Sequence, residues 1–223
     1  MGYSVIQFCP VLLGGMTAGV FICNYTDGKL KRVHRVTAKR TLIIAVLNTL
    51  LWCGAFWVFG FQWVSLLYAL ASTALLGLSL VDLAIFEIPP EFNVFLAILG
   101  GIRILLDLKH WYEYIIGGCL VSGIFLLIIL VSKGKAMGGG DMKLMAAAGL
   151  LIGWKKILLA LALGAVFGSV IHLTLMAVSK KEKVLSFGPY LSAGIYVSIL
   201  FGDRMIGAYM DYLSRVAERA YLG

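Results

Sequence analysis

The sequence predicts an all-α fold, a polytopic membrane helical bundle of about eight transmembrane helices with little outside the bilayer. Hydrophobic residues make up 61% of the 223 residues and charged residues 13%, whereas a soluble domain is about half apolar and one quarter charged. The mean hydropathy is +0.96. Because the apolar residues form long continuous runs rather than the short alternating strands of a membrane barrel, helices are expected to cross the bilayer.

Eight apolar runs are candidates for helices that enter the bilayer, where about 20 residues are needed for a full span. They lie at residues 3–23, 41–60, 62–86, 92–106, 112–131, 141–152, 156–178 and 187–201. The sixth run is too short for a full span, so we expect it to be buried among its neighbours. A partly amphipathic segment, 204–221, follows the last run.

Basic residues are concentrated in the loop at 24–40 and in the loops before the sixth and eighth runs. Because lysine and arginine favour cytoplasmic loops, these three loops are predicted to face the cytoplasm. Lys155 and Lys156 go against this bias. The net charge of +8 therefore indicates topology, and without a basic patch interleaved with aromatic residues we expect contact with membrane lipid and no nucleic-acid partner.

Two aspartates lie within or against the apolar runs, Asp82 near the end of the third and Asp141 at the start of the sixth. Ionisable residues in a membrane segment are candidates for function by default. Asp82 lies about 10 Å along a helix before Pro89, and Asp141 opens a helix that enters from the same side. Both carboxylates are therefore expected at one depth near the cytoplasmic face.

Two carboxylates at close range cannot both ionise cheaply, so the pair is expected to share a proton and to titrate as a unit. One carboxylate and one carboxylic acid acting on a water molecule is the chemistry of aspartic proteases. Each residue also has a simpler explanation. Asp141 after glycines suits a helix N-cap, and Asp82 suits a partner for a Lys or Arg on another helix.

Three glycines precede Asp141, namely Gly138, Gly139 and Gly140. Because glycine adopts backbone conformations that other residues avoid, we predict that these residues let an extended substrate backbone approach the Asp141 carboxylate. Pro89 and Pro90 are predicted to end the helix that carries Asp82. A peptide bond inside an intact helix is shielded, so a protease in a membrane must accept a locally unwound substrate.

Three motifs in this order resemble those of the type IV prepilin peptidase family, which are Gly-x-Gly-Asp intramembrane aspartyl proteases. "GGGDMKLMAAAG" contains Asp141, and "DLAIFEIP" contains Asp82 followed by Ile88 and Pro89. "FGPYLSAG", from Phe187, is similar to a stretch of the family's last core helix. The resemblance covers residues 62–201, and the ordered set is more specific than Gly-x-Gly-Asp alone.

The resemblance implies a six-helix catalytic core at 62–203, preceded by a two-helix region with a short basic loop at 1–61 and followed by a tail at 204–223. It implies Asp82 and Asp141 as the catalytic pair of an aspartic endopeptidase. This enzyme would remove the leader peptide from type IV prepilins or pseudopilins at the cytoplasmic face of the bacterial plasma (inner) membrane. The pathway, whether pilus assembly or protein secretion, is left open.

Cofactor expectations also follow from the resemblance. Many relatives carry two CxxC pairs that bind zinc in the first cytoplasmic loop, but this loop has no cysteine pair, so neither zinc nor another metal site is expected. Proteolysis needs no cofactor. S-adenosylmethionine is implied only if the chain also N-methylates its product, which the sequence leaves open.

Glu87 and Glu91 flank the two prolines. They are interpreted either as solvated loop charges or as groups that attract a basic leader peptide before cleavage. The alternative function for the whole chain is a proton-coupled transporter or channel that uses its membrane aspartates. That alternative favours carboxylates at the bilayer midplane and an internal repeat, and no clear repeat is visible. A presenilin-like protease is disfavoured because Val81, not tyrosine, precedes Asp82.

Overall fold

The computed structural model describes residues 5–30, 37–134, 138–179 and 186–222, and these residues are helical apart from short turns. Eight α-helices form in this part of the chain, together with a short 3-10 helix, η1 (Leu108–His110). They are α1 (Val5–Lys29), α2 (Ala38–Phe59), α3 (Trp63–Ile85), α4 (Pro90–Leu106), α5 (Trp111–Val131), α6 (Gly139–Ile152), α7 (Trp154–Ser179) and α8 (Gly188–Leu222). The all-α prediction is confirmed.

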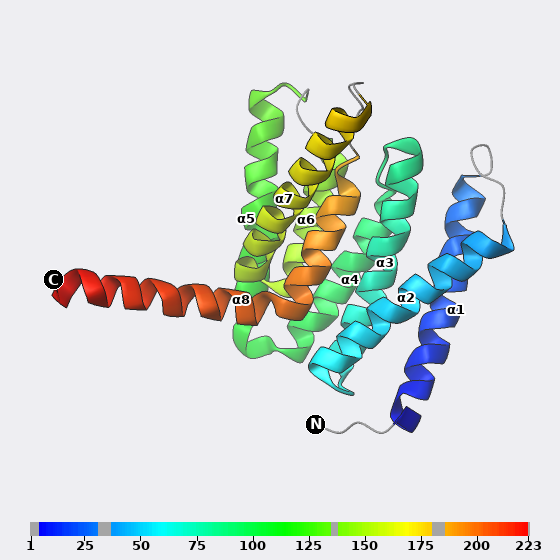
Figure 1. The fold of residues 1–223 in the computed structure, drawn as a ribbon, viewed down its shortest axis with the longest axis horizontal. Helices are drawn as coiled ribbons and strands as arrows, with labels where there is room; N and C mark the ends of the chain where they lie inside the picture. Colours follow the sequence, from blue (N-terminus) through cyan, green and yellow to red (C-terminus); the bar gives the residue numbers. More distant parts are fainter. Residues whose placement is uncertain (1–4, 31–36, 135–137, 180–185, 223) are drawn as a thin grey trace.

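The helices alternate in direction through the bundle (Figure 1). α1, α3, α5 and α7 finish at the upper end of that view, and α2, α4, α6 and α8 begin there. Asp82 lies near the end of α3 and Asp141 near the start of α6. Both aspartates therefore belong to this end of the bundle, which we call the aspartate end.

Five helical segments are long and apolar enough to cross a membrane, namely Gln7–Lys29, Ala38–Phe59, Trp63–Ile85, Leu108–Val131 and Trp154–Thr174. The polytopic prediction is confirmed, but five such segments among the described residues are fewer than the expected eight spans. α6, with 14 residues, is too short for a hydrocarbon core about 30 Å thick, and α4, with 17 residues, is at the lower limit for a span. The apolar part of α8 ends at Asp203.

α8 differs from the sequence-based expectation of a core helix that ends before a separate tail. Its 35 residues form one continuous helix from Gly188 to Leu222. The first part packs in the bundle, and the last part leaves the bundle nearly at right angles (Figure 1). The predicted boundary after residue 203 therefore marks a change of direction and exposure within one helix.

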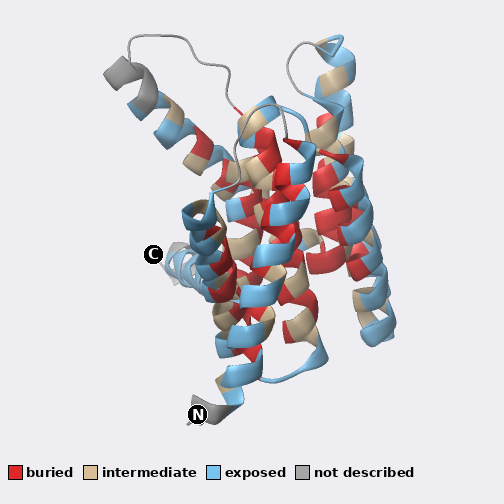
Figure 2. Ribbon diagram, turned by 90° about the vertical axis from the view of Figure 1, so that its right-hand side faces the viewer, coloured by how far each residue is buried: buried red, intermediate tan, exposed pale blue. Residues whose placement is uncertain are grey.

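Apolar side chains cover the outward faces of the bundle as well as its interior. Figure 2 shows buried residues turned toward neighbouring helices and exposed ones along the outer faces. Many of the exposed ones are large and apolar, including Leu13, Phe21, Ile43 and Val131. A bundle whose exterior is as apolar as its core is suited to hydrocarbon on all sides.

A buried polar network ties the first three helices together. The Asn48 side-chain amide donates to the Gly15 carbonyl at 2.9 Å, and the Thr73 hydroxyl donates to Asn48 Oδ1 at 2.9 Å. Trp52 Nε1 donates to Thr73 Oγ1, also at 2.9 Å. Because hydrocarbon offers no competing partners, these bonds fix how α1 and α2 sit against α3.

The short helix α6 is held by close backbone contact with α5. A Cβ added at Gly149 would overlap the carbonyl of Gly117, and one added at Gly117 would lie 2.6 Å from the Gly149 carbonyl oxygen. Small residues let membrane helices approach this closely. The contact fixes the position of α6, and with it the position of Asp141 at its start.

An ion pair that the sequence analysis did not identify joins α1 to α2 near the aspartate end. Arg40 Nη1 lies 2.6 Å from Asp27 Oδ1, and the Asp27 side chain is 2% exposed. Removing one partner of a buried ion pair leaves an uncompensated charge, which costs more than the pair contributes.

We therefore expect Arg40→Met to lower the free energy of unfolding by about 3–5 kcal/mol. The measurement is denaturant unfolding of the purified protein in detergent micelles. The matched control is the double variant Asp27→Leu/Arg40→Met, which removes both charges and should recover most of the loss. Equal stability of the wild type and Arg40→Met would contradict a structural role for the pair.

Candidate active site

Asp82 lies in the last turn of α3, close to a sharp end of the helix. α3 ends at Ile85, and Phe86 follows in the left-handed conformation at φ 57°, with its backbone N–H bonded to the Asp82 carbonyl. The helix thus ends within one residue of the end of the predicted third run, 62–86, and Phe86 terminates it rather than the two prolines. Pro90 instead opens α4, where its fixed φ and missing N–H are tolerated.

The Asp82 carboxylate is 5% exposed and is held by two donors from the start of α8. Ser186 Oγ donates to Oδ2 at 2.5 Å, and the backbone N–H of Gly188 donates to the same oxygen at 2.9 Å. Gly188 is the first residue of α8, so the carboxylate occupies the positive end of that helix.

Gly188 leaves room for this contact. A Cβ on Gly188 would lie 2.5 Å from Asp82 Oδ2 and 3.1 Å from Cγ. Any side chain at this position would therefore push the carboxylate away from the α8 N-terminus. The close approach of helix backbone to carboxylate requires glycine.

Asp141 is the third residue of α6, after Gly139 and Gly140, and the N-cap position is occupied by Gly138. No side-chain hydrogen bond caps the helix, so the N-cap explanation of Asp141 is not supported. Asp141 is partly buried, and burial, followed by the nearby charge of Asp82, raises the pKa of its carboxyl group to about 6.

The simpler explanation of Asp82, an ion pair with a basic residue, is also unsupported among the described residues. The partners of its carboxylate there are a serine hydroxyl and a backbone amide. α4 and α8 both pack against α3 and against α6. These two helices link the helix that carries Asp82 to the helix that carries Asp141.

The three predicted access glycines do not use left-handed backbone conformations. Gly138 is extended, with φ −78° and ψ 145°, and Gly139 and Gly140 are helical. At Gly140, the missing Cβ instead leaves room for a neighbouring side chain. A Cβ on Gly140 would lie 3.0 Å from Ile88 Cβ, whereas one on Gly138 or Gly139 would meet nothing within 4 Å. Gly140 thus allows the segment after Asp82 to pack directly on the start of α6.

The remaining predicted residues lie around this contact. Pro89 is buried and is the N-cap of α4, and Ile88 is partly buried against Gly140. Glu87 is exposed. Glu91 is also exposed but is paired with Lys29, whose Nζ lies 2.5 Å from Glu91 Oε1. The two glutamates therefore differ, because Lys29 already compensates the charge of one of them.

Ser186 and Gly188 are the site residues that sequence reasoning missed. "FGPYLSAG" was noted as a motif, but no role followed from it, and Ser186 stands just before it. Their sequence separation from Asp82 is 104 and 106 residues, so no local spacing rule could connect them. A serine followed by glycine at the start of an apolar helix was the available signal, because such a terminus binds carboxylates.

No group of three or more His, Cys, Asp or Glu suited to a metal ion occurs within residues 5–30, 37–134, 138–179 and 186–222. Cys23, the cysteine at the edge of the first basic loop, is buried and contacts Asp27 and Thr41. These residues do not make a zinc-binding set. The absence of zinc stays an expectation from the sequence.

Fold and site together define a class of protein, a polytopic helical membrane protein with two aspartates at one end of its bundle. Residues 69–173, which include both aspartates, match the model of the type IV leader peptidase family. Through this segment the chain is similar to that family.

Curated relatives support the same assignment. A prepilin leader peptidase/N-methyltransferase of Stutzerimonas stutzeri is 28% identical over 193 residues, which are 83% of this chain and 66% of that protein. Proteins of the same description from Legionella pneumophila and Bacillus subtilis are 29% and 30% identical, over 76% and 61% of this chain and 61% and 56% of their own length. The chain thus spans about two thirds of the length of such relatives. No solved structure matches it.

Proposed function

We propose that this protein is an aspartic endopeptidase that removes the leader peptide from type IV prepilins or pseudopilins. The observation that carries the proposal is the placement of Asp82 and Asp141 at one end of the bundle, where Ile88 packs on Gly140, inside the segment that matches the leader peptidase family. Two coupled carboxyl groups supply a base and an acid to one water molecule. The similarity to prepilin leader peptidases supplies the substrate class.

The hydrogen bonds around Asp82 are the basis for assigning one carboxyl group as the base and the other as the acid. Ser186 and Gly188 both donate to Oδ2, which leaves Oδ1 to accept a hydrogen bond from a water molecule. On this geometry we assign Asp82 as the base and Asp141 as the acid. Water loses its proton to Asp82 as its oxygen attacks the scissile carbonyl carbon, while Asp141 protonates the carbonyl oxygen. As the resulting diol collapses, one hydroxyl returns a proton to Asp141, the C–N bond breaks, and the amine leaves with the proton that Asp82 took from water.

The proposed location is the bacterial inner membrane, with the aspartate end facing the cytoplasm. The basic residues near that end support this orientation, since Lys29 and Arg40 lie at the end of α1 and the start of α2. Placement of both carboxyl groups at one end also weighs against the transporter alternative, which favours the midplane. Lipid surrounds the apolar exterior in this arrangement.

The direct test is incubation of the purified protein with a prepilin and S-adenosylmethionine, followed by mass measurement of the product. Loss of the leader mass supports the peptidase proposal, and an additional methyl mass on the new N-terminus would assign methylation as well. An unchanged prepilin would refute the peptidase proposal. Cleavage should proceed without added S-adenosylmethionine and in the presence of a zinc chelator.

The difference between the two glutamates gives a prediction about leader binding. If acidic groups attract a basic leader, Glu87→Gln should raise KM about two- to fivefold at low salt and less at high salt, because salt screens exposed charges over about 8–10 Å. Glu91→Gln is the matched control and should change KM less, since Lys29 already pairs with it. Equal KM changes at both salt concentrations would contradict the attraction.

A further inference from the structure

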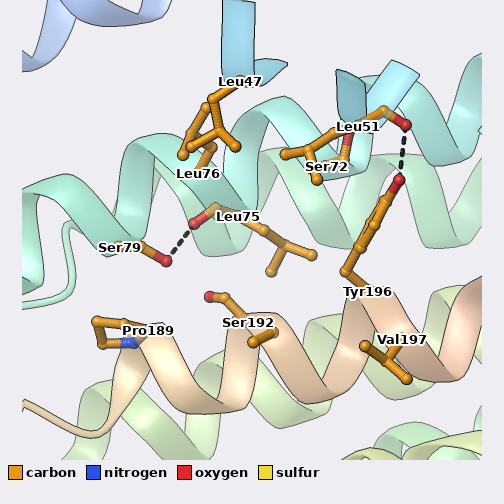
Figure 3. Close-up of a pocket in the computed structure, with 11 residues that line it drawn as sticks. Leu47, Leu51, Ser72, Leu75, Leu76, Ser79, Pro189, Ser192, Tyr196 and Val197 are labelled. Carbon is orange, nitrogen blue, oxygen red and sulfur yellow. Dashed lines mark hydrogen bonds between the residues drawn. The ribbon is translucent and has the colours of Figure 1, made fainter. Parts of the chain in front are cut away.

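An apolar pocket lies between α3 and α8, beside the helix ends that hold Asp82. Eleven residues from α2, α3 and α8 line it, and its volume is about 240 Å³. Figure 3 shows Leu75, Leu76 and Ser79 of α3 on one side and Pro189, Ser192 and Val197 of α8 on the other. Leu47 and Leu51 of α2 lie along the top of the view.

The pocket adjoins the candidate active site on both helices. Pro189 directly follows Gly188, whose N–H is bonded to Asp82. Ser79 lies one helical turn before Asp82. From Ser79 to Ser72 the lining of α3 extends about 5–15 Å from Asp82 toward the middle of the bundle. A chain bound in extended form across the aspartates advances about 3.3 Å per residue, so it would reach the pocket about two to four residues from the scissile bond.

The size and lining of the pocket fit one large apolar side chain. A dry apolar cavity of about 150 Å³ already holds a benzene ring. Here the wall is formed mainly by leucines, proline, valine and the ring of Tyr196, whose hydroxyl is turned away to the Leu51 carbonyl at 2.8 Å. An aromatic or branched aliphatic side chain would therefore be accommodated and a charged one excluded.

One polar group in the pocket has no partner. Ser192 is 5% exposed, and its Oγ makes no hydrogen bond within the described residues. Figure 3 shows its hydroxyl pointing into the space between α8 and Leu75. Ser79, by contrast, donates to the Leu75 carbonyl at 2.7 Å. A buried hydroxyl without a partner is costly to keep, and a bound polypeptide would supply one through its backbone.

We propose that this pocket is a subsite for the protein substrate. It takes a large apolar side chain about two to four residues from the scissile bond, on the part of the chain that enters the bundle, and Ser192 bonds to the substrate backbone there. The inference rests on the proposed peptidase function. A lipid acyl chain would also suit the apolar wall, but it offers no backbone group to the Ser192 hydroxyl.

The first test fills the pocket with Ala193→Phe. Ala193 lines the pocket and is exposed, so the added ring fits without displacing the packed face of α8. Ala165→Phe, at an exposed position of α7 outside the lining of this pocket, is the matched control. Cleavage is measured on a prepilin with its native apolar residues and on variants in which each residue within five of the scissile bond is replaced by Ala.

We expect Ala193→Phe to raise KM about tenfold or more for the native substrate. For a substrate with Ala at the position that occupies the pocket, the KM of Ala193→Phe should differ from that of the wild type by less than about twofold. The KM of Ala165→Phe should match that of the wild type for every substrate. Equal effects of Ala193→Phe on all substrates would overturn the subsite. Failure of the wild-type protein to cleave any prepilin would instead refute the peptidase proposal itself and the subsite with it.

The second test concerns Ser192. Ser192→Ala should raise KM about two- to tenfold, the usual net worth of one hydrogen bond. Its unfolding midpoint should stay unchanged or rise, because a buried unpartnered hydroxyl is removed. A lower midpoint with unchanged KM would show a purely structural serine and overturn its binding role. Pocket labelling by a photoactivatable phospholipid that persists under saturating prepilin would assign the pocket to lipid and overturn the proposal.

Discussion

Asp141→Asn is expected to abolish leader cleavage while the protein stays folded. The amide keeps the size of the side chain but cannot deliver or accept the proton that the coupled pair exchanges with water. Loss of general acid–base catalysis at one position removes about 10²–10⁴ in rate, and kcat should fall by at least that amount. The measurement is single-turnover cleavage of a prepilin by the purified variant.

Asp82→Asn should show the same loss, since the two carboxyl groups act as a unit. Far-ultraviolet circular dichroism and the unfolding midpoint in detergent serve as controls for folding. The pH profile of the wild type should be bell-shaped, because the fully protonated pair has no base and the fully ionised pair has no acid. Retained cleavage by folded Asp141→Asn would refute the mechanism.

Gly188→Ala is expected to have the second largest effect. The new Cβ would lie 2.5 Å from Asp82 Oδ2, so either the carboxylate or the start of α8 must move. A displacement of about 1 Å in a catalytic group costs on the order of 10²-fold in rate. We therefore expect kcat to fall about a hundredfold, with KM changed much less, in steady-state cleavage assays.

Gly123→Ala is the matched control, because a Cβ at that position in α5 meets nothing within 4 Å. It should cleave as the wild type does. Ser186→Ala removes one of the two donors to Asp82 without adding volume, so a smaller loss of kcat and a shifted pH profile are expected. Wild-type activity in Gly188→Ala would show that Asp82 does not depend on the α8 N-terminus.

The fold class followed from the sequence because membrane helices are long local features. The composition and the length of each apolar run predicted helices in nearly the right places, including the short one from Gly139 to Ile152. The number of full spans did not follow, since α4 and α6 have only 17 and 14 residues. The predicted third run, 62–86, nearly matches α3, but the composition gave no sign that the left-handed Phe86 ends the helix.

The candidate site was likewise predicted only in part from the sequence. The sequence singled out Asp82 and Asp141, because a carboxylate beside hydrocarbon is rare enough to require an explanation. It could not reveal that the glycines before Asp141 provide space for Ile88 rather than unusual backbone angles. It also could not distinguish Glu91 from Glu87, because the difference is a lysine on another helix.

The sequence by itself determined that this is a polytopic helical membrane protein with two aspartates near one end of its bundle. These features are local, since hydropathy and helix rise set depth along each helix separately. Only the tertiary structure decided what surrounds the aspartates. Ser186 and Gly188 reach Asp82 from more than 100 residues away, and α3 and α8 enclose a pocket beside it. Such contacts depend on which helices pack together and at what rotation, and no single apolar run encodes either.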